Sequence, residues 1–525
     1  MVQITGQQTG TPGNDVFLGS RDASNLEASS SASGIDRAVI NALGGDDRIE
    51  GQAIRQVTPE ATSDIDTTSY GIERSGIRAD GGTDTIVGTG SSVSNSNLRG
   101  STTGYGAFAG AADGGGGNDS FVFSGNGEGA QENRGFGISF FVLDGGGGDD
   151  RFEVKGSASA PGSVFDFEGD AAPTSNAFGI EKGTLNGGSG REDIVVEAIA
   201  SGFGDGSSVG ADGSTINGDG DNDRIAIAAK TLSFGNDSFG ISDTSVSGGN
   251  GDDTIEVSGE SNARQLNATR AISSGADNNS QIDGGNGNDT ITINSVANFS
   301  VRSRAGDSVA YGARNATVTG GNGGDTIALN ATSSQTFFNA TAYAAFNSEI
   351  KGGADNDTIQ LQAIGQSAGK DRIDGAFRSK IRGGSGNDVI QISTEIPAPG
   401  TSYGAFKSEV RGGAGDDRIK ISIGRFGTLN IQDSLINGGA GNDVFDVGIG
   451  SGTIRGGAGN DLAIVDFFDE QTMNFEIIRG GVRISGTLDK SGKELAWSQD
   501  ILGVESLQFG TEVASIQAFA TKFSQ

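Results

Sequence analysis

Aspartate returns at the end of a glycine-rich turn along most of this chain. The cleanest copies read G-G-x-G-[ND]-D and continue into an alternating apolar segment, as in GGAGDDRIKI, whose turn ends at Asp417. Glycine lets the backbone fold tightly and turn its carbonyl groups inward, and the aspartate adds a carboxylate. Oxygen atoms of these two kinds are the ligands that Ca²⁺ takes in proteins. The turns are therefore predicted to bind calcium ions.

Six of the fifteen turns depart from the full pattern. The turn of Asp15 has lost its leading glycine pair, and LGGDD and DGGTD, which end at Asp47 and Asp84, are two residues short. GGSGRED, which ends at Asp193, carries one inserted residue. GDGDND and GGADND place aspartate where glycine is expected, so their extra carboxylates are candidates for replacement ligands. The predicted Ca²⁺ ligands are the turn aspartates from the second turn onward: Asp47, Asp84, Asp119, Asp150, Asp193, Asp223, Asp253, Asp289, Asp325, Asp357, Asp388, Asp417, Asp443 and Asp461.

The spacing of the turns indicates a repeat architecture. Neighbouring turn aspartates are mostly 26 to 37 residues apart, with one interval of 43 and a last one of 18. A period of this size is typical of solenoids, in which each coil packs only on its neighbours. After one turn Ile419, Ile421 and Ile423 alternate with polar residues, which predicts a strand with one buried face. We expect an all-β parallel β-helix or β-roll solenoid of about 14–15 coils over residues 1–461.

A second recurrent feature is a glycine that lies 13 residues before the turn aspartate and usually follows an aromatic residue. The aromatic residues could form a carbohydrate-binding strip or a stacked structural ladder, and the ladder is the preferred interpretation. The alternation does not give their facing, because Phe406 and Val410 already take the inward parity in their coil. The aromatic residues at this position are Tyr70, Tyr105, Phe136, Phe239, Tyr311 and Tyr403.

The pattern changes from about residue 462, where a strand-rich piece contains Trp497 and the segment ILGVESLQF. An open solenoid end exposes apolar core and unpaired strand edges, so a cap is required. Residues 462–525 are therefore predicted to form a β-rich cap.

Composition excludes several classes of function. The formal charge is −31, so nucleic acid is not expected as a partner. About one Ca²⁺ per repeat would cancel most of that charge. The chain has no cysteine and no histidine, which excludes disulfides, thiolate or imidazole zinc sites and histidine-dependent catalysis. No apolar stretch is long enough for a transmembrane helix, and the first residues do not resemble a Sec signal peptide.

The turns resemble the nonapeptide G-G-x-G-x-D-x-U-x of the repeats-in-toxin (RTX) family, in which U is apolar. The resemblance covers most of the chain, and VESLQF is similar to the segment that often follows the last RTX repeat. It implies a Ca²⁺-bound β-roll, with turn aspartates and turn carbonyls as ligands, and type I secretion through an uncleaved signal in 462–525. The usual roll has two turns per 18-residue coil, whereas only the step from Asp443 to Asp461 has that length here. We therefore expect a wider coil with ions mainly along one edge.

The sequence favours a secreted calcium-binding structural or adhesive protein of the cell surface or extracellular matrix over an enzyme. It would fold on binding Ca²⁺, and its repeat architecture permits self-association into filaments or a surface layer (S-layer). The alternative is a β-helix that binds or modifies polysaccharide, as a lectin, lyase or epimerase, with cell-surface polysaccharide as the partner. Lys351, Arg382 and Arg411 stand just before their glycine pairs and are the cations that such a protein could use, although the preferred interpretation is that they offset the neighbouring turn acids.

Overall fold

The computed structural model describes most of the chain and is almost entirely β-structure. The described residues fall into two compact units: Met1–Gln281 with Ala297–Gly306, and Ile282–Val296 with Asp307–Gln525. The described ranges are 2–23, 30–57, 65–94, 100–161, 173–202, 204–233, 235–263, 270–300, 307–335, 339–367, 371–397, 400–424, 428–465, 472–490, 493–509 and 511–518.

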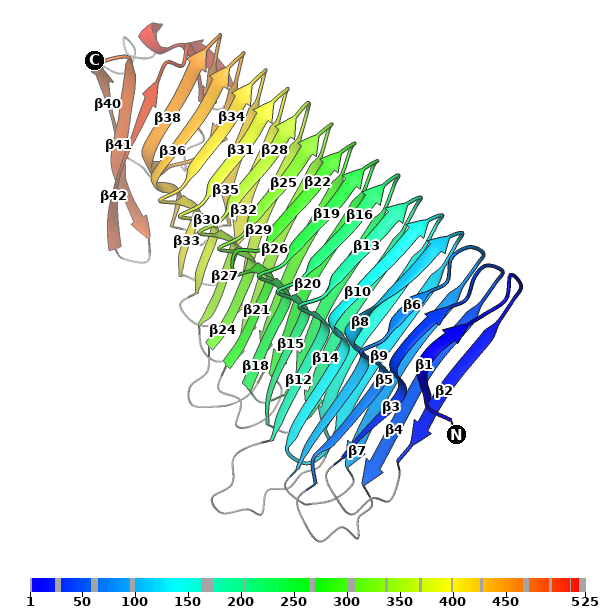
Figure 1. Ribbon diagram of the computed structural model, residues 1–525. Helices are drawn as coiled ribbons and strands as arrows, with labels where there is room; N and C mark the ends of the chain where they lie inside the picture. The colour runs from blue at the N-terminus through cyan, green and yellow to red at the C-terminus, as the bar shows by residue number, and fades with distance from the viewer. Residues whose placement is uncertain are drawn as a thin grey trace, which may run out of the picture. The chain divides into compact units, whose positions relative to one another are not determined.

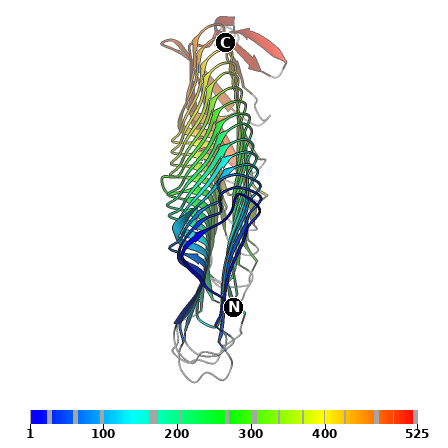
Figure 2. The same cartoon turned by 45° about the vertical axis from the view of Figure 1, so that its right-hand side comes forward.

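Both units repeat one plan, in which each coil has strands before the glycine-rich turn and one strand after it (Figure 1). We name the strands before the turns sheet A and the strands after them sheet B. Within each unit, neighbouring coils pair in parallel and in register; in sheet B of the first unit, for example, Phe152, Ile194 and Ile225 are aligned. Successive coils of each unit can also be followed in Figure 2. The predicted all-β parallel solenoid is confirmed.

The first unit contains the following strands. In sheet A they are β1 (Ile4–Thr9), β3 (Ser30–Asn41), β5 (Thr67–Glu73), β6 (Gly76–Arg78), β8 (Ser101–Gly116), β10 (Glu132–Gly147), β12 (Thr174–Glu181), β13 (Thr184–Ser189), β15 (Asp205–Asp212), β16 (Thr215–Gly220), β18 (Gly235–Ser242), β19 (Ser245–Asn250) and β21 (Arg270–Asp277). In sheet B they are β2 (Val16–Asp22), β4 (Arg48–Val57), β7 (Thr85–Ser94), β9 (Ser120–Glu128), β11 (Arg151–Ala160), β14 (Asp193–Gly202), β17 (Arg224–Leu232) and β20 (Thr254–Ala263).

The second unit follows the same plan and ends in five further strands. Strands β22 and β23 are grouped with it because most of their residues belong to it, although Gln281 and residues 297–299 belong to the first unit. Its sheet A contains β22 (Gln281–Asn286), β24 (Asp307–Arg314), β25 (Thr317–Asn322), β27 (Ala340–Phe346), β28 (Glu349–Ala354), β30 (Arg372–Phe377), β31 (Lys380–Ser385), β33 (Thr401–Phe406), β34 (Glu409–Ala414), β36 (Leu429–Ala440) and β38 (Gly450–Ala458). Its sheet B contains β23 (Thr290–Phe299), β26 (Thr326–Gln335), β29 (Thr358–Ser367), β32 (Val389–Glu395), β35 (Arg418–Ile423), β37 (Val444–Val447) and β39 (Leu462–Ile464). The last strands are β40 (Thr472–Ile478), β41 (Gly481–Lys490), β42 (Lys493–Leu502), β43 (Ser506–Phe509) and β44 (Glu512–Ser515).

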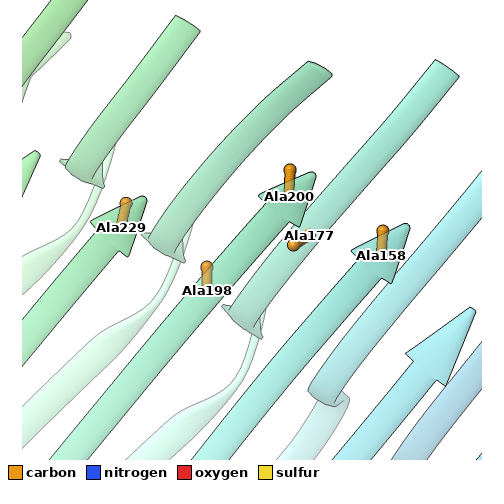
Figure 3. Close-up of a cluster of buried hydrophobic side chains, with 5 residues drawn as sticks. All are labelled: Ala158, Ala177, Ala198, Ala200 and Ala229. Carbon is orange, nitrogen blue, oxygen red and sulfur yellow. The ribbon is translucent and has the colours of Figure 1, made fainter. Parts of the chain in front are cut away.

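The core lies between the inner faces of the two sheets. Ile419 and Ile421 are buried as the alternation predicts, whereas Ile423 at the end of its strand remains partly exposed. Small side chains fill the space where the sheets lie close together. Figure 3 shows such a cluster of fully buried alanines on β11, β12, β14 and β17. Because small side chains let the two sheets pack closely, a chain of modest apolar content can still bury a continuous core.

The glycine that recurs 13 residues before the turn aspartate faces sheet B. A Cβ on Gly106 would lie 2.6 Å from the backbone nitrogen of Ser124, so only glycine fits. Phe136 and Ile138 pair with the neighbouring strands but the glycine between them does not, and the register is the same on both sides of it. At this point two successive residues, Gly137 and Ile138, are buried, so the alternation shifts by one residue and the flanking aromatic residues lie on the outer face of the strand.

The outward aromatic rings stack on one another along the coils. Ring centroids lie 5.0 Å apart for Tyr70 and Tyr105, 4.6 Å for Tyr105 and Phe136, and 5.5 Å for Tyr311 and Tyr343. The planes of these three pairs are within 12° of parallel. This confirms the predicted ladder for these residues and shows that neighbouring rings cover one another's faces.

Parallel pairing continues beyond residue 461. Strand β42 pairs in parallel with β38, and β43 pairs in parallel with β39, so part of the predicted cap forms another coil. Strands β40 and β41 pair antiparallel beside β42, and β44 pairs antiparallel with β43. The β-rich character predicted for residues 462–525 is present in their described part. None of the described helical residues belongs to a helix that is long and apolar enough to cross a bilayer.

Candidate metal centre

Each turn spans six residues, which we call its frame. The last residue of the frame, normally the aspartate, is named the ladder position because its backbone N–H and side chain bond to the adjacent coils. In the turn that ends at Asp388, Gly384 and Gly386 have φ values of 131° and 123°, which disfavour other residues. A Cβ on either glycine would also lie 2.0–2.1 Å from a carbonyl oxygen of the preceding coil. A Cβ on Gly383, the first residue of the frame, would lie 2.2 Å from Oδ2 of Asp388. Each conserved position of this motif within the chain thus has its own steric reason.

This geometry predicts unequal effects for two alanine substitutions in one turn. Gly114 is the first residue of its frame, and a Cβ there would lie 2.3 Å from Oδ2 of Asp119. Gly114→Ala should therefore lower the free energy of unfolding by roughly 1–3 kcal/mol. Gly116→Ala is the matched control because the nearest atom to its Cβ is 4.0 Å away. Chemical denaturation should show a change within about 0.5 kcal/mol for the control; equal losses would contradict the steric account.

The turn aspartates form a hydrogen-bonded ladder from coil to coil. The backbone N–H of Asp357 donates to Oδ1 of Asp388 at 2.8 Å, and the N–H of Asp388 donates to Oδ1 of Asp417 at 2.8 Å. In the second unit the ladder runs from Asp289 to Asp461. In the first unit, hydrogen bonds of this kind join Asp15 through to Asp150 and Glu192 through to Asp253. One carboxylate oxygen of each acceptor thus has a structural role.

In most turns the residue before the turn aspartate takes part in a second ladder, which runs in the opposite direction and is interrupted where that residue is Thr83, Arg191 or Gly324. The N–H of Asp416 donates to Oδ1 of Asn387 at 2.7 Å, and the N–H of Asn442 donates to Oδ1 of Asp416 at 2.6 Å. These side chains are exposed. Asparagine and aspartate serve equally here because only a side-chain oxygen acceptor is needed, which explains the [ND]-D pair.

The second carboxylate oxygen of the ladder aspartates is the feature that points to an ion. It is buried and has no hydrogen-bond partner, whereas buried polar atoms normally have one. The aspartates concerned are at most 3% exposed, and in the turns whose frame begins with glycine the free Oδ2 lies beside that glycine. The residues with this orphaned oxygen are Asp47, Asp84, Asp119, Asp150, Asp325, Asp357, Asp388, Asp417, Asp443 and Asp461.

Burial raises the pKa of the ladder aspartates above the ordinary value. Burial is the largest cause; neighbouring carboxylates raise the pKa further, while the hydrogen bond from the preceding coil opposes the shift. An ionised ladder without a counterion is therefore unfavourable, and either protons or cations would relieve it. The pKa rises to about 7 for Asp119, Asp357 and Asp417, and to about 6 for Asp84, Asp150, Asp325 and Asp443.

Two turns that look short in the sequence have the full length. The turn that ends at Asp47 begins at Ala42, and Leu43 adopts a φ of 79° where glycine is usual. The turn that ends at Asp84 uses Asp80 at the same place, with a φ of 69°. The prediction that these turns lack two residues is wrong, because non-glycine residues take the left-handed conformation. Both turn aspartates keep the ladder position.

The predicted position at Asp193 is wrong by one residue. Asp193 begins β14 with a side chain 43% exposed and forms an ion pair with Arg224, 3.0 Å away. Glu192 takes the ladder position instead, and its backbone N–H donates to Oδ1 of Asp223 at 2.8 Å. Burial, together with the adjacent Asp223 carboxyl, raises the pKa of Glu192. The sequence reads as an insertion because glutamate replaces aspartate and a second acid follows it.

The exchange between Glu192 and Asp193 gives a direct prediction. Glu192→Gln should reduce the number of bound Ca²⁺ ions by about one, because it removes the carboxylate at the ladder position. Asp193→Asn should leave that number unchanged, since it removes only an exposed ion pair. Equilibrium dialysis of the two variants against the parent protein measures both numbers. Loss of an ion from the Asp193 variant alone would restore the original prediction.

The second unit's ladder ends on Glu505, which sequence reasoning did not assign. Its Oε2 accepts the backbone N–H of Asp461 at 2.7 Å, and Ser506 after it pairs with Leu462. The signal in the sequence was VESLQF, where an acid precedes an alternating strand as in every coil. At the start of the first unit's ladder, Oδ2 of Asp15 accepts hydrogen bonds from the backbone N–H and the hydroxyl of Thr11, so this carboxylate is already satisfied.

The remaining predicted ligands and the extra turn acids are placed as follows. Asp223, Asp253 and Asp289 are buried at the ladder position of their turns. The extra acids of the two aspartate-containing turns are exposed, and Asp219, Asp221 and Asp355 adopt φ values of 66–79° in place of glycine. Within the described residues, no three acidic side chains converge on one point. An ion in these turns would therefore take one carboxylate per coil and complete its oxygen shell with turn carbonyls.

Comparisons with known proteins do not identify a family for this chain. No protein-family profile matches it, and no curated protein sequence matches it.

Proposed function

We propose that this protein is a secreted, calcium-binding structural protein of the cell surface or extracellular matrix. The observation that carries the proposal is the row of buried, partnerless carboxylate oxygens in successive turns. An oxygen-only donor set of carboxylates and backbone carbonyls suits Ca²⁺. The resemblance of the turns to RTX repeats supports the same assignment and suggests type I secretion.

Bound Ca²⁺ would supply positive charge to the ladder. The arrangement of the ladder carboxylates explains why this charge would favour the folded chain. Successive turns place ionised carboxylates one coil apart in a chain with a formal charge of −31. Their repulsion opposes stacking, and the glycine-rich turns lose much backbone entropy on folding. A cation that binds only the stacked form adds its binding free energy to folding. A chain that folds after reaching a calcium-rich exterior suits export.

The proposal is tested by adding Ca²⁺ to purified, chelated protein at pH 8 while recording circular dichroism and light scattering. A cooperative gain of β signal is expected. Growth of scattering after that gain would support self-association into a filament or surface layer, whereas constant scattering would assign a monomeric function. A β signal that does not respond to Ca²⁺ would refute calcium-dependent folding.

A further inference from the structure

The outer face of sheet A in the second unit carries positive charge that the turn sites do not use. Three successive coils, built from β27, β28, β30, β31, β33 and β34, lie side by side there (Figure 1). Their outward charged residues comprise seven cations and three acids, Glu349, Asp374 and Glu409, a net charge of +4 (seven minus three). We name the seven cations the basic face: Lys351, Arg372, Arg378, Lys380, Arg382, Lys407 and Arg411.

Three of these cations form one column across the coils. Lys351 is aligned with Arg382, and Arg382 with Arg411. Lys351 lies 3.6 Å from Glu349, which also pairs with Arg382, while Arg411 pairs with Glu409. Among the described residues, no ion pair joins the column to a turn aspartate. The column therefore belongs to the outer face and does not offset the ladder acids through direct contact.

Three other cations of the basic face have no carboxylate partner among the described residues. Arg378 and Lys407 occupy left-handed corners, with φ values of 51° and 49°, and both are exposed. Each lies over an aromatic ring, at 5.2 Å from Phe377 and 5.4 Å from Phe406. Lys380 is exposed between them in the sequence. These charges are available to an outside partner.

The rings beneath the cations cannot offer their faces to a sugar. Phe346, Phe377 and Phe406 stack with centroids 4.9 and 5.2 Å apart and planes within 7° of parallel. Arg372 covers Phe377 and Phe406 from outside while binding the buried Asp374 at 3.1 Å. Recognition on this face must therefore depend on charge, which excludes a neutral glycan held by ring stacking.

We propose that the basic face binds an acidic polysaccharide that carries carboxylate or sulfate groups. Cations repeat once per coil, about 4.8 Å apart, and such a row suits a polymer with regularly repeated anions. The turn edge beside it exposes acids such as Asp355 and Asp416. A broad anionic partner, such as a bilayer or a nucleic-acid duplex, would meet those acids as well, whereas a narrow chain can follow the basic face alone.

This inference names a partner for the proposed surface protein. It rests on the proposed function only in assuming that the protein meets this polysaccharide at the cell surface or in the extracellular matrix. The test compares Lys380→Glu/Lys407→Glu with Arg418→Glu/Lys420→Glu, which reverses the same number of charges on exposed residues of sheet B. Binding of the full chain to a sulfated glycosaminoglycan and to a polyuronate is measured by biolayer interferometry in Ca²⁺. Neutral glucan, phosphatidylglycerol vesicles and duplex DNA serve as comparison ligands. Circular dichroism of each variant verifies the fold.

The parent chain should bind at least one acidic polysaccharide and none of the comparison ligands. The sheet A variant should lose roughly tenfold in affinity and the sheet B variant less than about twofold. Absence of binding to both acidic polymers, equal losses in the two variants, or equal binding to vesicles or DNA would overturn the inference. Unchanged affinity in both variants would also overturn the inference, because binding would then depend on bound Ca²⁺ bridging the protein to the polysaccharide. Structure and binding that both persist in chelator would refute the calcium proposal while leaving the basic face supported.

Discussion

Chelation of calcium at pH 8 should abolish most of the β signal of this protein. Each ladder aspartate with an orphaned oxygen would then carry an uncompensated, buried charge beside those of the adjacent coils. A ligand at 100 times its Kd stabilises the folded state by about 2.7 kcal/mol per independent site. Losing several such sites exceeds the usual stability of a domain. Circular dichroism and thermal melts with and without chelator measure the effect, and an unchanged cooperative melt would contradict it.

The pH dependence of the metal-free chain follows from the raised pKa values. In the unfolded chain the aspartates titrate near pH 4, whereas the folded ladder holds protons up to a pKa of about 6 to 7. Proton binding therefore stabilises the folded form fully below about pH 4, and that stabilisation is lost as the pH rises through about 6 to 7. Denaturation in chelator should show higher stability at pH 4.5 than at pH 8. The reverse order would contradict a desolvated ladder.

Asp388→Asn should change the stability of the protein in opposite directions with and without calcium. Asparagine keeps the oxygen that accepts the N–H of Asp357 but removes the negative charge of the orphaned oxygen. In Ca²⁺ the variant should lose about one bound ion and roughly 1–3 kcal/mol of unfolding free energy. In chelator the stability of the variant should equal or exceed that of the parent, because one of the carboxylates that repel one another along the ladder has been neutralised. Chemical denaturation measures the loss in Ca²⁺, and the pH at which the β signal disappears in chelator, between pH 4.5 and 8, compares the two metal-free chains.

Two companion variants isolate the cause of that crossover. Asp416→Asn removes the same charge from the neighbouring coil at an exposed position, where the side-chain oxygen accepts the backbone N–H and the side-chain amide of Asn442. It should leave both stabilities almost unchanged. Asp388→Ala removes the ladder acceptor as well as the charge, so it should be less stable than Asp388→Asn under both conditions. If the Asp416 variant showed the same stability changes as the Asp388 variant, the crossover would be explained by net charge alone and not by the buried ladder position.

Much of the fold was predictable because each residue position of the turn motif is restricted by its own local steric requirement. Gly384 and Gly386 supply left-handed backbone beside a neighbouring carbonyl, and Gly383 leaves room for the carboxylate of Asp388. The alternation after the turn gives the buried positions of Ile419 and Ile421. Local sterics and period-2 patterning act within a few residues, so one sequence is enough to reveal them.

The errors arise where the same geometry is met by other residues. Leu43 and Asp80 adopt the left-handed conformation without being glycine, so a glycine count misjudges the length of their turns. Glu192 takes the place of aspartate at the ladder position, and because Asp193 follows it, the sequence pattern assigned that position to Asp193 instead. These choices depend on stacking against the adjacent coils, which a local pattern does not contain.

The facing of the aromatic residues was also beyond the sequence. The alternation shifts by one residue at the recurrent glycine without a change of pairing register, so that Phe406 lies on the outer face and stacks on Phe377. The column formed by Lys351, Arg382 and Arg411 was visible as a recurrent position, but its partners were not. Only the pairing register shows that outer glutamates, and not ladder acids, contact these cations.

The most direct test of the calcium ladder is to count the ions bound to the folded chain by equilibrium dialysis at pH 8, with Mg²⁺ in excess as the competing ion. The ladder predicts about ten or more Ca²⁺ per chain, one for each turn with an orphaned carboxylate oxygen. A folded chain that holds one ion or none would contradict it and would leave the aspartates with the structural ladder as their whole role.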